Sequence, residues 1–216
     1  MKKYKNFIIL TTLILSIQSL LYFSTKLLIN NYNIINSFIE FPLIKIFVYP
    51  YNLWYPFIIL NMFIIYKYDK NKFGSLITTM LITTIMANIT FIIYPSMMIR
   101  PNIEITNLTT WLLDYTYKID TPAVNCLPSM HCMFCFVTNY YIINSKNINI
   151  NKKILITISS SIIVLSTLFI KQHIIEDAIL ALIYTTLAII ITYINKNKIK
   201  KLFSKIIQKK QIHDTQ

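Results

Sequence analysis

Residues 171–194 read KQHIIEDAILALIYTTLAIIITYI, a polar string followed by an apolar run. About 20 apolar residues are what a helix needs to cross a bilayer. The chain holds about six such runs, at 7–28, 52–68, 75–94, 127–145, 154–171 and 174–194. Because 55% of its 216 residues are hydrophobic, the sequence predicts an all-α integral membrane bundle of about six transmembrane helices.

The charges of the chain are distributed asymmetrically. The net charge is +13, and most basic residues lie at the N-terminus, after the second and fourth apolar runs, and in the last segment. Cytoplasmic loops of membrane proteins carry such an excess, so we expect both termini in the cytoplasm of a multi-pass cell-membrane protein. The same distribution argues against nucleic acid as a partner, and the frequent Ile, Asn and Lys residues indicate a bacterial source.

The sequence predicts one membrane domain at 1–195, whose motif-bearing core spans about 75–185, and a basic tail at 196–216. The first apolar run is long and lacks a small-residue cleavage site, so we expect a retained helix rather than a signal peptide. The tail is expected to contact anionic lipid headgroups at the inner surface or to be disordered. The segment 29–50 is either a short interfacial helix or an ordered loop.

Three polar strings flank the apolar runs. Arg100 follows the third run, NCLPSMH at 125–131 opens the fourth, and KQHIIED at 171–177 opens the sixth. Polar residues at membrane depth are costly and need a reason. Alternating helices place all three strings near the outer interface, so the sequence predicts an active site there.

Two histidines carry the chemistry that this site suggests. His173 and Asp177 are spaced i and i+4, so on a helix they share a face, and the carboxylate can fix the tautomer of a nucleophilic imidazole. His131 can exchange a proton with a leaving group. Each also has a structural interpretation, as a packing pair and as a lone interfacial histidine.

Groups that bind anions lie close to the histidines in sequence. Arg100 and Lys171 can bind phosphate oxygens, and Ser129 offers a hydroxyl and an N–H at a helix start. Both cations also fit side chains that reach toward headgroups. Cys132 and Cys135 have CxxC spacing without a second pair, so we expect buried thiols, no metal site and no cofactor.

These strings resemble the signatures of the type-2 phosphatidic-acid phosphatase (lipid phosphate phosphatase) superfamily. The signatures run Lys-x6-Arg-Pro, Pro-Ser-Gly-His and Ser-Arg-x5-His-x3-Asp. Arg100-Pro101 resembles the end of the first, residues 128–131 resemble the second, and residues 166–177 match the spacing of the third.

The resemblance implies a role for each matching residue. His173 would attack phosphorus and form a phosphohistidine, and Asp177 would orient it. His131 would protonate the leaving oxygen and then activate the acceptor. Arg100 and Ser129 would bind phosphate oxygens.

Three positions depart from the signatures. Ile93 stands where the first has lysine, Thr167 where the third has arginine, and Met130 where the second has glycine. Lys171 lies one helical turn after Thr167, so it can supply one of the missing charges. The pattern is similar to the branch that contains inositol-phosphoceramide and sphingomyelin synthases, which move a phosphate-bearing headgroup between lipids.

The leading hypothesis is therefore a membrane lipid phosphatase that cleaves a phosphomonoester or diphosphate by a metal-independent phosphohistidine mechanism. Phosphatidic acid, phosphatidylglycerophosphate and an isoprenyl phosphate such as undecaprenyl pyrophosphate are candidate substrates. The alternative within this chemistry is a lipid headgroup phosphotransferase. The alternative of another class is a non-enzymatic transporter or scaffold, although no internal repeat supports it.

Overall fold

The computed structural model describes residues 4–203, and these form an all-helical bundle with one short strand pair, as predicted. The long helices are α1 (Lys5–Leu28), α3 (Trp54–Tyr68), α4 (Lys70–Ile93), α6 (Met130–Asn144), α7 (Ile150–Phe169) and α8 (Ile175–Ile194). The short ones are η2 (Lys45–Phe47), α2 (Val48–Asn52) and α5 (Leu108–Ile119). Residues 196–203 are also helical, and the rest of the predicted tail lies outside the described residues.

Five helical stretches in the described chain are long and apolar enough to cross a membrane. They are Lys5–Leu28, Lys45–Tyr68, Lys70–Ile93, Ile150–Phe169 and Ile175–Ile194. Large apolar side chains, among them Leu20, Ile89 and Leu182, point outward from these helices. Such a surface suits hydrocarbon rather than water, so the chain is a multi-pass membrane protein. The remaining predicted span, 127–145, corresponds to α6, which has 15 residues.

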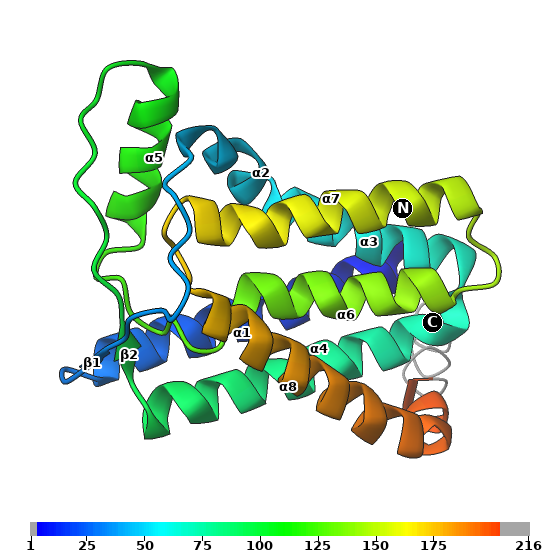
Figure 1. Ribbon diagram of the computed structural model, residues 1–216. Coiled ribbons are helices and arrows are strands. Elements are labelled where there is room, and N and C mark those ends of the chain that lie inside the picture. The colour runs from blue at the N-terminus through cyan, green and yellow to red at the C-terminus, as the bar shows by residue number, and fades with distance from the viewer. Residues whose placement is uncertain (1–3, 204–216) are drawn as a thin grey trace.

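Helix α6 is the centre of the bundle. It packs against α3, α4, α7 and α8, while α1 covers α3 and α4 from outside (Figure 1). Its residues Cys132, Met133, Phe134 and Cys135 are completely buried. The thiols of Cys132 and Cys135 are free, as expected of packing residues.

Hydroxyl groups link the helices across this apolar core. The Thr79 hydroxyl lies 2.8 Å from the Tyr141 hydroxyl and donates to Thr192 at 2.9 Å. The Thr90 and Tyr184 hydroxyls lie 2.8 Å apart. A polar group inside a membrane bundle needs a partner there, so these bonds fix how α4 lies against α6 and α8.

One end of the bundle carries the irregular structure. There β1 (Asn33–Ile34) pairs in parallel with β2 (Ser96–Met97), and α5 and α2 lie over the end of α7 (Figure 1). The segment 29–50 is thus irregular, apart from β1, until Lys45 and helical only at its end. The start of α1 and the end of α8 lie at the opposite end of the bundle.

Candidate active site

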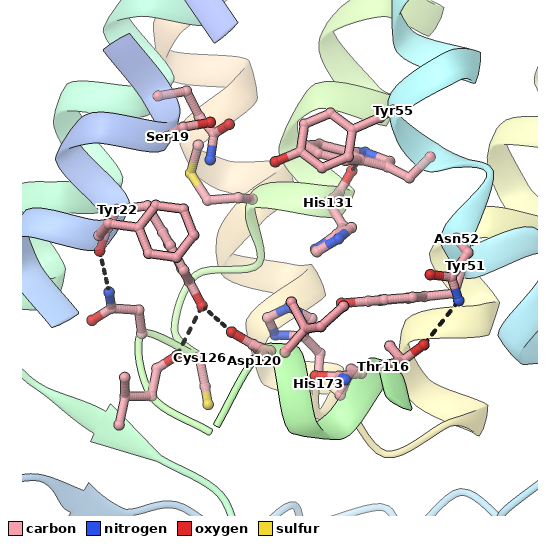
Figure 2. Close-up of a pocket in the computed structure, with 18 of the residues that line it drawn as sticks. Ser19, Tyr22, Tyr51, Asn52, Tyr55, Thr116, Asp120, Cys126, His131 and His173 are labelled. Atoms are coloured by element: carbon pink, nitrogen blue, oxygen red, sulfur yellow. Dashed lines mark hydrogen bonds between the residues drawn. The ribbon is translucent and has the colours of Figure 1, made fainter. Parts of the chain in front are cut away.

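A cavity of about 300 Å³ opens at the end of the bundle that carries α5. It brings Arg100, His131 and His173 to one space, although they are far apart in sequence. Figure 2 shows the two histidines in this cavity. Aromatic side chains form much of the remaining wall, namely those of Tyr22, Phe23, Tyr51, Trp54 and Tyr55. The meeting of the three polar strings at one depth agrees with the alternation of helices that the sequence predicted.

His173 and Asp177 form the predicted pair. His173 Nδ1 lies 2.9 Å from Asp177 Oδ2, and the Asp177 side chain is fully buried. His173 does not lie on a helix, however, because it precedes α8 by two residues. Asp177 is the third residue of α8, and its Oδ2 also accepts the N–H of Ile174 at 3.1 Å. A carboxylate at this position satisfies an unpaired N–H of the helix start, so one group caps the helix and holds the imidazole.

His131 is the second residue of α6 and is held by aromatic rings. Its ring lies 4.6 Å from that of Tyr51 and 4.4 Å from that of Trp54, between centroids. The Trp54 indole N–H also donates to the His131 carbonyl at 3.1 Å. The His131 and His173 rings are 5.9 Å apart, so one phosphate ester can contact both imidazoles.

Arg100 lines the cavity, but its terminal nitrogens already have protein partners. Nη1 donates to the carbonyls of Tyr117 at 3.3 Å and Asp120 at 3.1 Å. Nη2 donates to Asp120 Oδ2 at 2.6 Å and to Gln172 Oε1. Only Nε lacks a partner. The predicted phosphate-binding role of Arg100 therefore requires the phosphate to share or replace these acceptors.

Lys171 lies on the other side of His173, beside a second cavity of about 160 Å³. Its φ of 54° is left-handed. The Gln172 N–H donates to the Thr167 carbonyl at 3.0 Å and the Lys171 N–H to that of Leu168 at 3.1 Å. This pair of bonds defines a Schellman motif, in which glycine usually takes the left-handed position. Lys171 thus ends α7 and does not reach the larger cavity.

Ser129 is the N-cap of α6 and is fully buried. Its hydroxyl accepts the N–H of Cys132 at 3.3 Å, and its own N–H donates to the Asp177 carbonyl at 3.2 Å. These bonds join the start of α6 to the start of α8. The structure thereby shows how Ser129 helps to place both histidines, while its predicted contact with phosphate stays a prediction.

The two positions that lack the expected cations do not face the cavity. Ile93 is 76% exposed at the end of α4, and Thr167 is fully buried, with its hydroxyl 3.8 Å from Cys132 Sγ. A further cation, to which the sequence gave no role, pairs with an aspartate that lines the cavity. Lys26 of α1 pairs with Asp120 at 3.3 Å, close to Arg100. Neither Lys26 nor Asp120 belongs to a motif, so the spacing of residues in the sequence could not reveal them.

Two buried side chains of α5 and the loop beside the cavity, Tyr117 and Cys126, are neutral. Burial raises the pKa of Tyr117 to about 12, so its hydroxyl stays protonated and donates to the Ile170 carbonyl at 2.5 Å. Burial also raises the pKa of the Cys126 thiol. Within residues 4–203 no group of three or more His, Cys, Asp and Glu side chains has the arrangement of a metal site.

Comparison with known proteins gives one match. The family model described as the PAP2 superfamily matches residues 71–201, which is more than half of the chain and includes all three motifs. Neither a curated protein nor a solved structure matches the chain. Members of this superfamily are phosphoesterases that act on lipid phosphates, and the match supports the same general chemistry here. The chain belongs to the PAP2 superfamily, the type-2 phosphatidic acid phosphatases.

Proposed function

We propose that this chain is a membrane phosphatase that removes phosphate from a lipid through a covalent phosphohistidine at His173. The observation that carries the proposal is the contact between His173 and the buried Asp177, beside His131 in one cavity. A carboxylate on one nitrogen of an imidazole orients the ring and leaves the other nitrogen as the nucleophile.

The reaction has two steps. The free Nε2 of His173 forms a bond to phosphorus, and the phosphorus–oxygen bond to the lipid breaks while the leaving oxygen takes a proton from His131. A water molecule then gives a proton to His131 and attacks phosphorus, and the phosphorus–nitrogen bond breaks. We propose that the phosphate oxygens lie against Arg100 and near the start of α6, where backbone dipoles favour an anion.

We also propose six crossings with both termini in the cytoplasm and the cavity at the outer face of a bacterial plasma membrane. An even number of crossings fits the structure, because the start of α1 and the end of α8 lie at the same end of the bundle. The five apolar helices then need α6 as the sixth crossing. Reporter fusions after residues 70 and 146 should report the cytoplasm.

The headgroup phosphotransferase is the second candidate. It starts from a phosphodiester, so that His173 carries the phosphate together with its headgroup after the first step, and an alcohol takes the place of water in the second step. The observation that favours it is the scarcity of free cations, since Ile93 and Thr167 replace two of them and Arg100 is held by Asp120. Product analysis distinguishes the two, because transfer gives a new phospholipid in place of a free phosphate compound.

The test is turnover by purified protein in vesicles that contain a panel of lipid phosphates and phospholipids. We expect product release that a chelator does not affect, and an acid-labile phosphoenzyme after rapid quenching. His173→Ala should abolish both, whereas the matched variant His213→Ala in the predicted tail should retain both. Full activity of His173→Ala would contradict the mechanism, and loss of activity with a chelator would contradict its independence of metal.

A further inference from the structure

Gln172 directly precedes His173 and lines the larger cavity together with it. It is only 2% exposed. The N–H groups of both residues donate to the Thr167 carbonyl at 3.0 Å, so one backbone acceptor fixes the turn that carries them. Gln172 falls at an unspecified position of the third signature, and the proposed reaction gives it no step.

The orientation of the Gln172 amide is fixed by Arg100. Arg100 Nη2 donates to Gln172 Oε1. Because a guanidinium has only donors, the oxygen of the amide and not its nitrogen must face Arg100. Gln172 Nε2 is therefore turned away from Arg100, and it is buried without a hydrogen-bond partner in residues 4–203. Arg100 Nε is likewise a buried donor without a partner in this part of the chain.

The unpaired nitrogens of Arg100 and Gln172 are unfavourable in the free protein, because a buried donor loses the hydrogen bonds that it makes with water. The carboxylate of Asp120 accepts from Arg100 Nη2 at 2.6 Å and leaves Nε unpaired. Arg100 and Gln172 both line the cavity of about 300 Å³. An acceptor that enters this cavity can supply the partner that these donors lack.

We infer that Gln172 is a substrate-binding residue, whose amide Nε2 donates to a phosphate oxygen beside Arg100 Nε. The inference rests on the proposed function and adds a residue to its phosphate-binding site. Ile93 and Thr167 stand where the signatures have cations, and Asp120 balances part of the charge of Arg100. A neutral donor beside the nucleophile replaces part of the lost binding, because a hydrogen bond to a charged group is stronger than one between neutral groups.

The burial of Gln172 makes its amide a better ligand than an exposed one. Nε2 is covered by protein atoms, so the amide turns to meet an oxygen in the cavity while its own oxygen stays on Arg100. An exposed amide would first have to give up its water, whereas this one gains a partner that it lacks in the free protein. Binding therefore removes an unfavourable contribution, which is the effect of a preorganised site.

The experiment measures the binding of tungstate, a tetrahedral oxyanion that mimics phosphate, to the purified full-length protein in detergent. Gln172→Met keeps the length of the side chain and removes its hydrogen-bonding groups, so the dissociation constant of tungstate should rise about tenfold. Gln18→Met is the matched control. Gln18 is buried at the same cavity, but its unpaired atom is the acceptor Oε1, which does not attract an anion, so the affinity should be unchanged.

A second measurement separates binding from a structural role. If Gln172 only holds the turn before α8, Gln172→Met should lower the melting temperature and leave the affinity for tungstate unchanged, which would overturn the inference. We expect the opposite, a melting temperature close to that of the wild-type protein and a weaker affinity, because the variant no longer buries an unpaired donor.

A second variant keeps the test decisive if Gln172→Met does not fold. Gln172→Glu retains the acceptor for Arg100 and replaces the donor by a charged oxygen, so tungstate should bind more weakly than to the wild-type protein by more than about tenfold. Wild-type affinity in either folded variant would overturn the inference and leave water as the partner of the amide. Failure of the proposed function is distinct, since the wild-type protein would then neither bind tungstate nor release phosphate from a lipid.

Discussion

The two walls of the cavity differ in how the sequence encodes them. The catalytic wall consists of the start of α6 and the turn between α7 and α8, where His131, His173 and Asp177 lie in short motifs. The other wall consists of α1, α2 and α3, and Asp120 connects α1 to the end of α5 through contacts with Tyr22 and Lys26, which are 98 and 94 residues away in sequence. Most of it precedes the residues that the family model matches. Local spacing thus predicts the proposed catalytic residues, and only long-range packing brings the other wall to them.

The largest effect should come from the catalytic wall. Asp177→Asn keeps the shape of the side chain but removes the charge that holds His173 Nδ1, so we expect kcat to fall about 10³-fold. The measurement is product release with a saturating substrate. A rise in KM with kcat unchanged would show that Asp177 acts by capping α8 and not through the imidazole.

The second effect separates the two histidines. His131→Gln removes the proton donor, so we expect kcat to fall about 10²-fold with a lipid alcohol as leaving group. The nitrophenolate of a nitrophenyl ester leaves without a proton, so His131→Gln should slow the first step less with this substrate. The measurement is the rate of the pre-steady-state burst of nitrophenol. Equal losses in that step for both leaving groups would argue against His131 as the acid.

A smaller effect on kcat should come from Trp54 of α3, which contacts His131 from the other wall of the cavity. Trp54→Phe preserves an aromatic contact with His131 but removes the hydrogen bond to its carbonyl, so kcat should fall about fivefold because one neutral hydrogen bond is lost. Tyr55→Phe serves as the control, since Tyr55 packs against Trp54 and not against the histidine. A similar loss in both variants would mean that the wall affects binding as a whole.

The smallest effect on activity should come from Lys171. Lys171→Gly places the favoured residue at the left-handed position of the Schellman motif, so we expect a gain in stability of about 1 kcal/mol. Because the side chain faces the second cavity, kcat/KM should fall by less than about threefold, a typical effect of a distant charge. A loss above tenfold in both Lys171→Gly and Lys171→Ala would instead place this ammonium on the phosphate.

The sequence was sufficient for the parts of the molecule that follow from local chemistry. Apolar runs predict the helices, and the spacing of His173 and Asp177 predicts their contact, although a cap and not a shared helix face produces it. Asp120 could not be found in this way. An aspartate at the end of an amphipathic helix is ordinary in sequence, and only the tertiary fold brings Lys26 and Tyr22 of α1 to it.

The short length of α6 has a consequence for the membrane itself. The Lys72 ammonium near the start of α4 donates to the Asn144 carbonyl at the end of α6, so the two helices are level there. At about 1.5 Å per residue, α6 with 15 residues then begins roughly 10 Å before α4 with 24 residues ends. If a lipid phosphate is the substrate, as proposed, we expect its headgroup to move below the polar layer of the membrane to meet His131. Turnover should therefore depend on bilayer thickness, and thin or loosely packed membranes should favour the enzyme.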